Sequence, residues 1–198
     1  MNARPLLLLT PVALLLAGCH VSTRSHENGN KVDIGTPFGS LRVRTDEGAH
    51  MAGLGITQYP GSVPYKSSHD DSDSDSADVN MSFGNFHLGV RAASYKTSDG
   101  QDPVIAFYKK DLARYGEVLE CRDNKAVGEP TRTAQGLTCD EDRGHHHGYV
   151  HDSQSGIELR AGSPQHEHIV ALEDKDGGTK IGLVSLDLPG HHDNKDSE

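Results

Sequence analysis

The chain has 198 residues, with 29 acidic side chains against 19 basic ones and a formal net charge of −10. This balance argues against nucleic acid and anionic lipid headgroups as partners, because both repel a negatively charged surface. The length allows one domain, and a hydrophobic content of 34% without tryptophan predicts a small core.

The first residues form a short apolar segment behind a single basic residue, Arg4. The apolar run from Pro5 to Ala17 covers about 13 residues, whereas a helix that crosses a bilayer needs about 20. A basic start, a short apolar core and small residues at its end are typical of a secretory signal. We therefore expect residues 1–18 to be a signal peptide.

The end of this segment, Leu16-Ala17-Gly18-Cys19, resembles the lipobox of bacterial lipoproteins. The resemblance implies that Cys19 becomes the first mature residue, with a diacylglycerol on its sulfur and, in many diderm bacteria, an acyl chain such as palmitate on its amine. Two or three chains hold a protein on a membrane stably. Because His20 stands where an inner-membrane retention signal has Asp, we expect the outer membrane, periplasmic face. The alternatives are a signal peptide cleaved elsewhere and an uncleaved anchor.

Assigning Cys19 to lipid leaves an even pair of cysteines, Cys121 and Cys139. An exported protein lies in an oxidising compartment, so this pair predicts a disulfide. Closing a loop of this size stabilises a fold by roughly 3 kcal/mol in the chain-entropy model. A catalytic cysteine is the alternative, but neither cysteine has a local nucleophile signature.

The sequence predicts two irregular segments, one before the main domain and one within it. Residues 19–30 are polar without hydrophobic periodicity, which predicts a tether. Residues 31–56, which follow, predict a β-hairpin and then a loop. Residues 67–78 are a low-complexity acidic stretch, which predicts a disordered, solvated loop.

The acidic loop also raises a calcium alternative, because Asp71, Asp73 and Asp75 alternate as in the first half of an EF-hand loop. The pattern then fails. Ser76 stands where the loop needs Gly, and Ser82 stands where it needs a bidentate Glu.

One amphipathic helix is predicted at about 102–115. Asp102 suits the N-cap, Pro103 the first helical position and Gly116 the C-terminal cap. Apolar residues recur at helical spacing and form one stripe: Val104, Ile105, Tyr108, Leu112 and Tyr115.

Short strands with glycine turns follow the helix, ending in a meander with its clearest hairpin at Gly177-Gly178. One helix covers only one sheet face, so we expect an α+β fold: an antiparallel β-sheet with one amphipathic helix packed on one face, preceded by the N-terminal β-hairpin. The α+β domain should span residues 57–188, and a disordered tail residues 189–198.

A second resemblance covers about residues 57–122. The stretch Tyr59-Pro-Gly-Ser62 and the helix with Phe107-Tyr108 and Leu112 are similar to a group of uncharacterised bacterial periplasmic lipoproteins. That group carries a YPGA-type strand and a DSxxxVxxFYxxxL helix followed by a strand. This chain departs from the pattern at Gly100-Gln101, where the group starts its helix sooner. The resemblance implies a fold and no activity.

Histidine is the remaining candidate for chemistry, with 13 in the chain. Residues i and i+2 of a strand share a face, so histidines at this spacing could bind one zinc or copper ion. The alternative is that the histidines are exposed polar residues without a ligand. The candidate ligands are His145, His147, His151, His166 and His168.

Catalytic motifs are missing from the sequence, including the nucleophile elbow, the zinc-protease helix and the phosphate-binding loop. We expect no enzyme but a membrane-anchored periplasmic lipoprotein that acts as an envelope binding or structural module. Its partners would be the membrane, through the lipid, and an envelope protein or glycan, with an apolar patch near Phe38, Tyr59 or Tyr65. The alternative is a His-rich protein that binds or buffers a transition metal.

Overall fold

The computed structural model describes residues 19–26, 29–46, 53–65, 76–139 and 156–189. These residues form one antiparallel sheet of eleven strands and a short helical segment. The strands are β1 (His20–His26), β2 (Gly29–Thr36), β3 (Gly39–Asp46), β4 (Val63–Pro64), β5 (Ser76–Phe83), β6 (Phe86–Thr97), β7 (Leu119–Arg122), β8 (Lys125–Ala126), β9 (Ile157–Ser163), β10 (His166–Lys175) and β11 (Gly178–Asp187).

The helical segment lies where the sequence predicts it. Helix α1 (Gln101–Leu112) continues into a 3-10 turn, η1 (Ala113–Tyr115), which ends at Gly116. The N-cap differs from the prediction, because Gly100 takes that position without a side-chain hydrogen bond. Asp102 lies instead in the first turn, where its charge still complements the positive end of the helix dipole.

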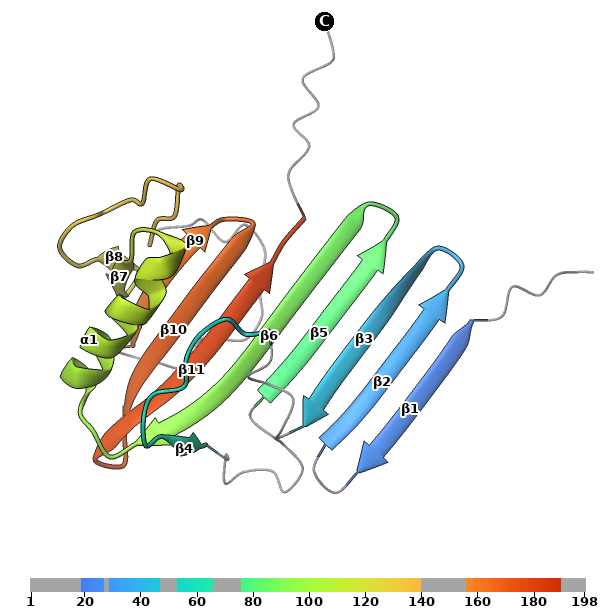
Figure 1. Cartoon of the computed structure of the whole chain (residues 1–198), viewed down its shortest axis with the longest axis horizontal. Helices are drawn as coiled ribbons and strands as arrows, with labels where there is room; N and C mark the ends of the chain where they lie inside the picture. The colour runs from blue at the N-terminus through green and yellow to red at the C-terminus, as the bar shows by residue number, and fades with distance from the viewer. Residues whose placement is uncertain (1–18, 27–28, 47–52, 66–75, 140–155, 190–198) are drawn as a thin grey trace, which may run out of the picture.

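The strand order across the sheet is β1-β2-β3-β5-β6-β11-β10-β9-β7-β8, with the short β4 beside β6. Helix α1 packs on β9, β10 and β11, so it covers only this part of the sheet (Figure 1). Strands β1, β2, β3 and β5 extend away from it on the other side of β6 (Figure 1).

The predicted α+β architecture is therefore wrong. The predicted hairpin exists as β2 and β3, but it does not precede a separate helix-covered sheet. Strand β3 pairs with β5, with Leu41 opposite Met81 and Val43 opposite Val79, which joins the hairpin to one large sheet. Sequence periodicity marks strands but not pairings between strands far apart in the chain.

The predicted polar tether also differs from the structure. His20–His26 forms β1, which pairs with β2 along its whole length. The segment lacks hydrophobic alternation because β1 is an edge strand whose side chains are largely exposed on both faces. Most of the predicted acidic loop, with Asp71, Asp73 and Asp75, lies outside the described residues, as does nearly all of the predicted tail.

Two turns show why the strands reverse where they do. Phe83 and Phe86 pair across the tight β5–β6 turn. Asp176 and Gly177, both with positive φ, form the β10–β11 turn beside the predicted position, and Gly178 begins β11. Positive φ at both central residues suits the right-handed twist of a two-residue hairpin.

Paired residues on neighbouring strands point to the same side, so the register divides the side chains between two faces. The face covered by α1, here called the helix face, holds the main core. That core includes Ala93, Tyr95, Val104, Tyr108, Leu112, Leu159, Val170, Leu172, Ile181 and Leu183. The other face, here called the disulfide face, holds a second small core of Leu119, Cys121, Leu137 and Cys139.

Candidate functional site

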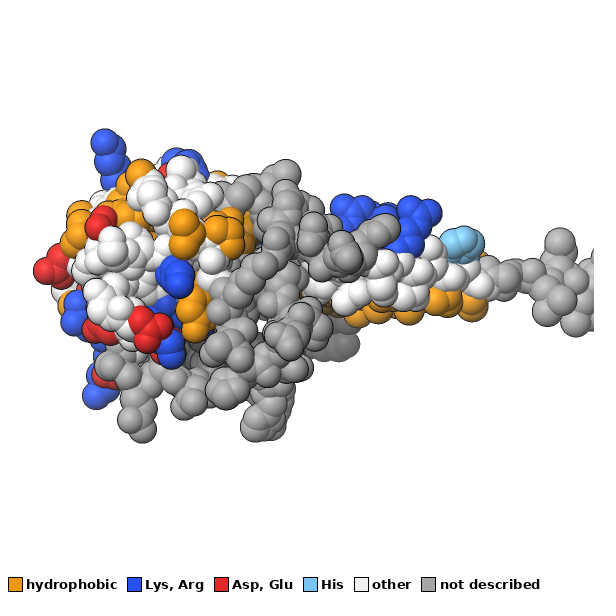
Figure 2. Space-filling model, turned by 90° about the horizontal axis from the view of Figure 1, so that it is seen from below, with side chains coloured by type: hydrophobic (Ala, Val, Ile, Leu, Met, Phe, Trp, Pro, Cys, Tyr) orange, Lys and Arg blue, Asp and Glu red, His pale blue; other side chains and the backbone are white. Residues whose placement is uncertain are grey.

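The strands that extend beyond the helix form a thin slab with two different faces. In this part of the sheet, at the right of Figure 2, Lys and Arg side chains line one side and hydrophobic side chains the other. Alternation explains this: on β3, Arg42 and Arg44 point to the helix face, whereas Leu41 and Val43 point to the disulfide face.

A shallow depression of about 350 Å³ lies on the basic side, over β3, β5 and β6. Three arginines and one histidine line it, with small polar side chains between them. The lining is Ser40, Arg42, Arg44, Asp78, Asn80, Met81, Ser82, His87 and Arg91. Guanidinium and hydroxyl groups in one hollow offer hydrogen-bond donors to an anionic group.

Two of the three arginines have carboxylate partners. Arg42 Nε lies 2.7 Å from Oδ1 of Asp33, and Lys31 Nζ lies 2.9 Å from Oδ2 of the same carboxylate. These cations lower the pKa of Asp33 through side-chain hydrogen bonds, first from Lys31 and then from Arg42. Arg91 lies more loosely between two other carboxylates, Asp78 at 3.7 Å and Asp187 at 3.6 Å.

Arg44 differs from its neighbours. Its Nε is buried and has no hydrogen-bond partner, and within the described residues no carboxylate lies in ion-pair distance of its side chain. A buried donor without a partner costs free energy, and no described carboxylate offsets the charge of this guanidinium. Arg44 is therefore the group in the depression best prepared to receive an anion.

The opposite side of the slab carries an apolar surface. Two rows of paired residues cross β1, β2, β3, β5 and β6 on the disulfide face. Their apolar members are Val21, Val32, Ile34, Leu41, Val43, Val79, Met81, Leu88 and Val90. An apolar surface of this kind marks an interaction site more often than a free surface.

Cys19 stands directly before β1. It is a free and exposed cysteine, and the predicted signal peptide before it lies outside the described residues. Within the described part of the chain, no helix combines the length and hydrophobicity needed to cross a membrane.

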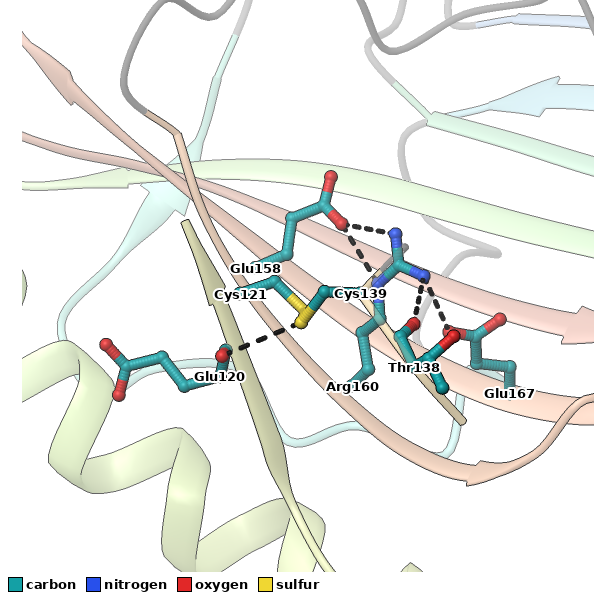
Figure 3. The surroundings of a disulfide bond; sticks show 7 residues. All are labelled: Glu120, Cys121, Thr138, Cys139, Glu158, Arg160 and Glu167. Carbon is teal, nitrogen blue, oxygen red and sulfur yellow. Dashed lines mark hydrogen bonds and ion pairs between the residues drawn. A yellow bond between two sulfur atoms is a disulfide. The ribbon is translucent and has the colours of Figure 1, made fainter. Parts of the chain in front are cut away.

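The predicted disulfide between Cys121 and Cys139 is confirmed, with the two Cα atoms 5.6 Å apart. It ties the segment after β8 to β7 on the disulfide face. Beside it lies Arg160, whose side chain is 3% exposed (Figure 3). Arg160 contacts Glu158 at 2.6 Å, Glu167 at 3.8 Å and the carbonyl oxygen of Thr138 at 3.5 Å.

Two of the predicted metal ligands, His166 and His168, lie within the described residues. Both side chains point to the same face of β10, but they make different contacts. His166 Nδ1 lies 2.9 Å from Asp187, and His168 stacks on the ring of Tyr115 with centroids 3.7 Å apart. Burial lowers the pKa of His168, and its Nδ1 is buried without a partner. His145, His147 and His151 lie outside the described residues, within which no three potential ligands group around a metal position.

The aromatic residues predicted for a binding patch separate in the structure. Tyr59 is part of the core, with its ring against Phe107 and its hydroxyl donating to Asp99, so it is not a surface residue. Tyr65 is half-buried under Lys180. Only Phe38 remains largely exposed.

The sequence reasoning missed the basic depression. Alternation of Arg42 and Arg44 with Leu41 and Val43 was visible in the sequence, but Arg91 and His87 come close only through the pairing of β3, β5 and β6. Comparisons with protein-family models, curated proteins and solved structures gave no match.

Proposed function

We propose that this chain is a lipoprotein, anchored by lipid on Cys19 to the periplasmic face of the outer membrane, and that it works as a non-enzymatic binding module. Its ligand site is the depression around Arg44, and its ligand is an anionic group on an envelope protein or glycan. Three observations support this: the lipobox-like stretch that ends at Cys19, the exposure of that cysteine, and the two-faced slab that begins one residue later.

The observation that carries the binding role is Arg44, which has no carboxylate in ion-pair distance among the described residues, in a hollow lined also by Arg42, Arg91 and His87. A planar guanidinium with free donors suits carboxylate and phosphate geometry. The chain is acidic as a whole, so a local basic hollow selects ligands by site geometry and not by overall attraction.

Calorimetric titration of the protein with inorganic phosphate and with a glutamate-rich peptide tests the binding role. We expect saturable binding of at least one probe, and we expect Arg44→Gln to abolish that binding. Arg24→Gln is the matched control, because Arg24 is an exposed arginine of the same face outside the depression. Equal loss in both variants, or no binding of either probe, would contradict the assignment.

Metabolic labelling with a radioactive fatty acid tests the anchor. The protein should incorporate the label, and a Cys19→Ser variant should not. A labelled Cys19→Ser variant would contradict the proposed attachment.

A further inference from the structure

We infer that one end of the sheet, here called the Cys19 end, inserts apolar side chains into the bilayer surface beside the lipid. This inference rests on the proposed lipidation of Cys19. The Cys19 end comprises the start of β1, the β2–β3, β5–β6 and β9–β10 turns, and the end of β11. The register places these together: His20 pairs with Gly35, Gly39 with Phe83, Phe83 with Phe86, and His166 with Asp187 and with Ser163.

Exposed hydrophobic side chains concentrate at this end. Among the described residues, seven large hydrophobic side chains are exposed, and five of them lie here. The five, with their exposed fractions, are Val21 (62%), Phe38 (83%), Phe83 (46%), Phe86 (42%) and Leu188 (37%). They come from four separate segments of the chain, so their gathering is a property of the fold and not of one hydrophobic stretch.

Acidic side chains avoid the turns of the same end. The three turns read Thr36–Gly39, Phe83–Phe86 and Ser163–His166, and none contains Asp or Glu in a chain that has 29 of them. Asp187 at the end of β11 is paired with His166 and Arg91. The opposite end carries Asp99 before α1, Asp102 in the first turn of α1, Asp174 near the end of β10 and Asp176 in the β10–β11 turn. The turns of the Cys19 end therefore carry no carboxylate whose desolvation would oppose insertion into the bilayer surface.

The exposed side chains continue into the apolar side of the slab. Val21, Phe83 and Phe86 belong to the disulfide face, and the next row on that face is Val21, Ile34, Leu41, Met81 and Leu88. Arg24, Arg42, Arg44 and Arg91 lie on the other face. The apolar side of the slab next to the Cys19 end can therefore enter the bilayer surface together with the exposed side chains, as the apolar face of an amphipathic helix does.

The bilayer is the occupant we assign, because the lipid holds this end within reach of it. β1 begins at the residue after Cys19, so no flexible spacer separates the anchor from the exposed side chains. Consecutive Cα atoms lie about 3.8 Å apart, which keeps Val21 close to the acyl chains' point of attachment. A second copy of the chain is the competing occupant of the apolar face.

The chain has no tryptophan, so a single introduced tryptophan reports its own surroundings. Phe38→Trp is a mild change at an exposed turn position, and Val63→Trp is the matched control. Val63 is 51% exposed and pairs with Lys96 near the opposite end of the sheet. Both lipidated variants would be reconstituted into phosphatidylcholine vesicles containing brominated acyl chains, which quench tryptophan on contact, and floated on a density gradient.

We expect both variants to float and Phe38→Trp to lose most of its emission while Val63→Trp keeps it. A chain that does not float would overturn the lipidation and this inference together. A chain that floats with both tryptophans equally bright would overturn the insertion alone. Crosslinking between copies at the apolar face, with an unquenched tryptophan at position 38, would assign that face to a second copy and likewise overturn it.

Discussion

The ring of Tyr115 stacks on the imidazole of His168, with centroids 3.7 Å apart and planes 18° from parallel. The Tyr115 hydroxyl donates to the carbonyl oxygen of Gly55, so η1, β10 and the loop before β4 meet at this point. The contact also marks the border between the basic part of the helix face and the core, because Arg91 and His168 both pair with Ser185.

This contact predicts a pH dependence of stability. Burial, and secondarily the charges of Arg114 and His166, lower the pKa of His168, against the opposing charges of Asp187 and Asp111. The unfolded chain therefore binds a proton below about pH 6.5 that the folded chain does not, and the free energy of unfolding falls as pH falls below that value.

His168→Phe keeps an aromatic ring against Tyr115 and removes the titration. Denaturant unfolding from about pH 7.5 to about pH 5.5 should show a smaller loss of stability in the variant than in the parent protein. Identical pH profiles would contradict a lowered pKa of His168 in the folded protein.

Gly55 is predicted to tolerate no side chain. Its φ is +74°, and a Cβ would lie 2.6 Å from the Tyr115 hydroxyl and 2.8 Å from His168 Nε2. Gly55→Ala should cost about 2–3 kcal/mol, from backbone strain and from the clash. Gly61→Ala is the control, because Gly61 has φ +78° and open space around it, and strain alone predicts about 1–2 kcal/mol. Equal losses by chemical denaturation would show that the contact is unimportant.

The disulfide should contribute substantially to stability. Cys121 and Cys139 are 18 residues apart and anchor the second core with Leu119 and Leu137. Replacing both by Ala should lower the free energy of unfolding by roughly 3 kcal/mol in the chain-entropy model. Thermal unfolding of the double variant measures this, and an unchanged midpoint would contradict the structural role.

The buried arginine beside the disulfide predicts a larger loss. Arg160→Met removes the cation between Glu158 and Glu167, leaving Glu167, which is 5% exposed, without that charge partner. Breaking a buried pair in this way costs about 3–5 kcal/mol. Arg122→Met removes an exposed arginine paired with Glu120 at 3.4 Å and should cost about 0–1 kcal/mol. Similar losses in the free energy of unfolding of the two variants would contradict the larger cost expected for the buried arginine.

Several elements could be predicted from local sequence. The helix ending at Gly116, the β2–β3 hairpin and the Cys121–Cys139 pair each rest on residues close in the chain or on a cysteine count. These signals are local because capping, turn chemistry and alternation act over a few residues.

The parts that could not be predicted depend on distant pairing. The pairing of Val43 with Val79 makes one long sheet from segments that local patterns leave separate, and burial of Tyr59 follows from its contact with Phe107. The polar strand β1 has no alternation to detect. The basic depression needs Arg44 on β3 and Arg91 on β6, on either side of Asp78 on β5, and only the register reveals this.

Intact-mass and N-terminal peptide mass spectrometry of the membrane-extracted protein tests the central claim most directly. The account predicts a mature chain that begins at Cys19 and carries the added mass of a diacylglycerol, with or without an amide-linked acyl chain. A mature chain that begins at another residue, or one in which Cys19 is unmodified, would contradict it.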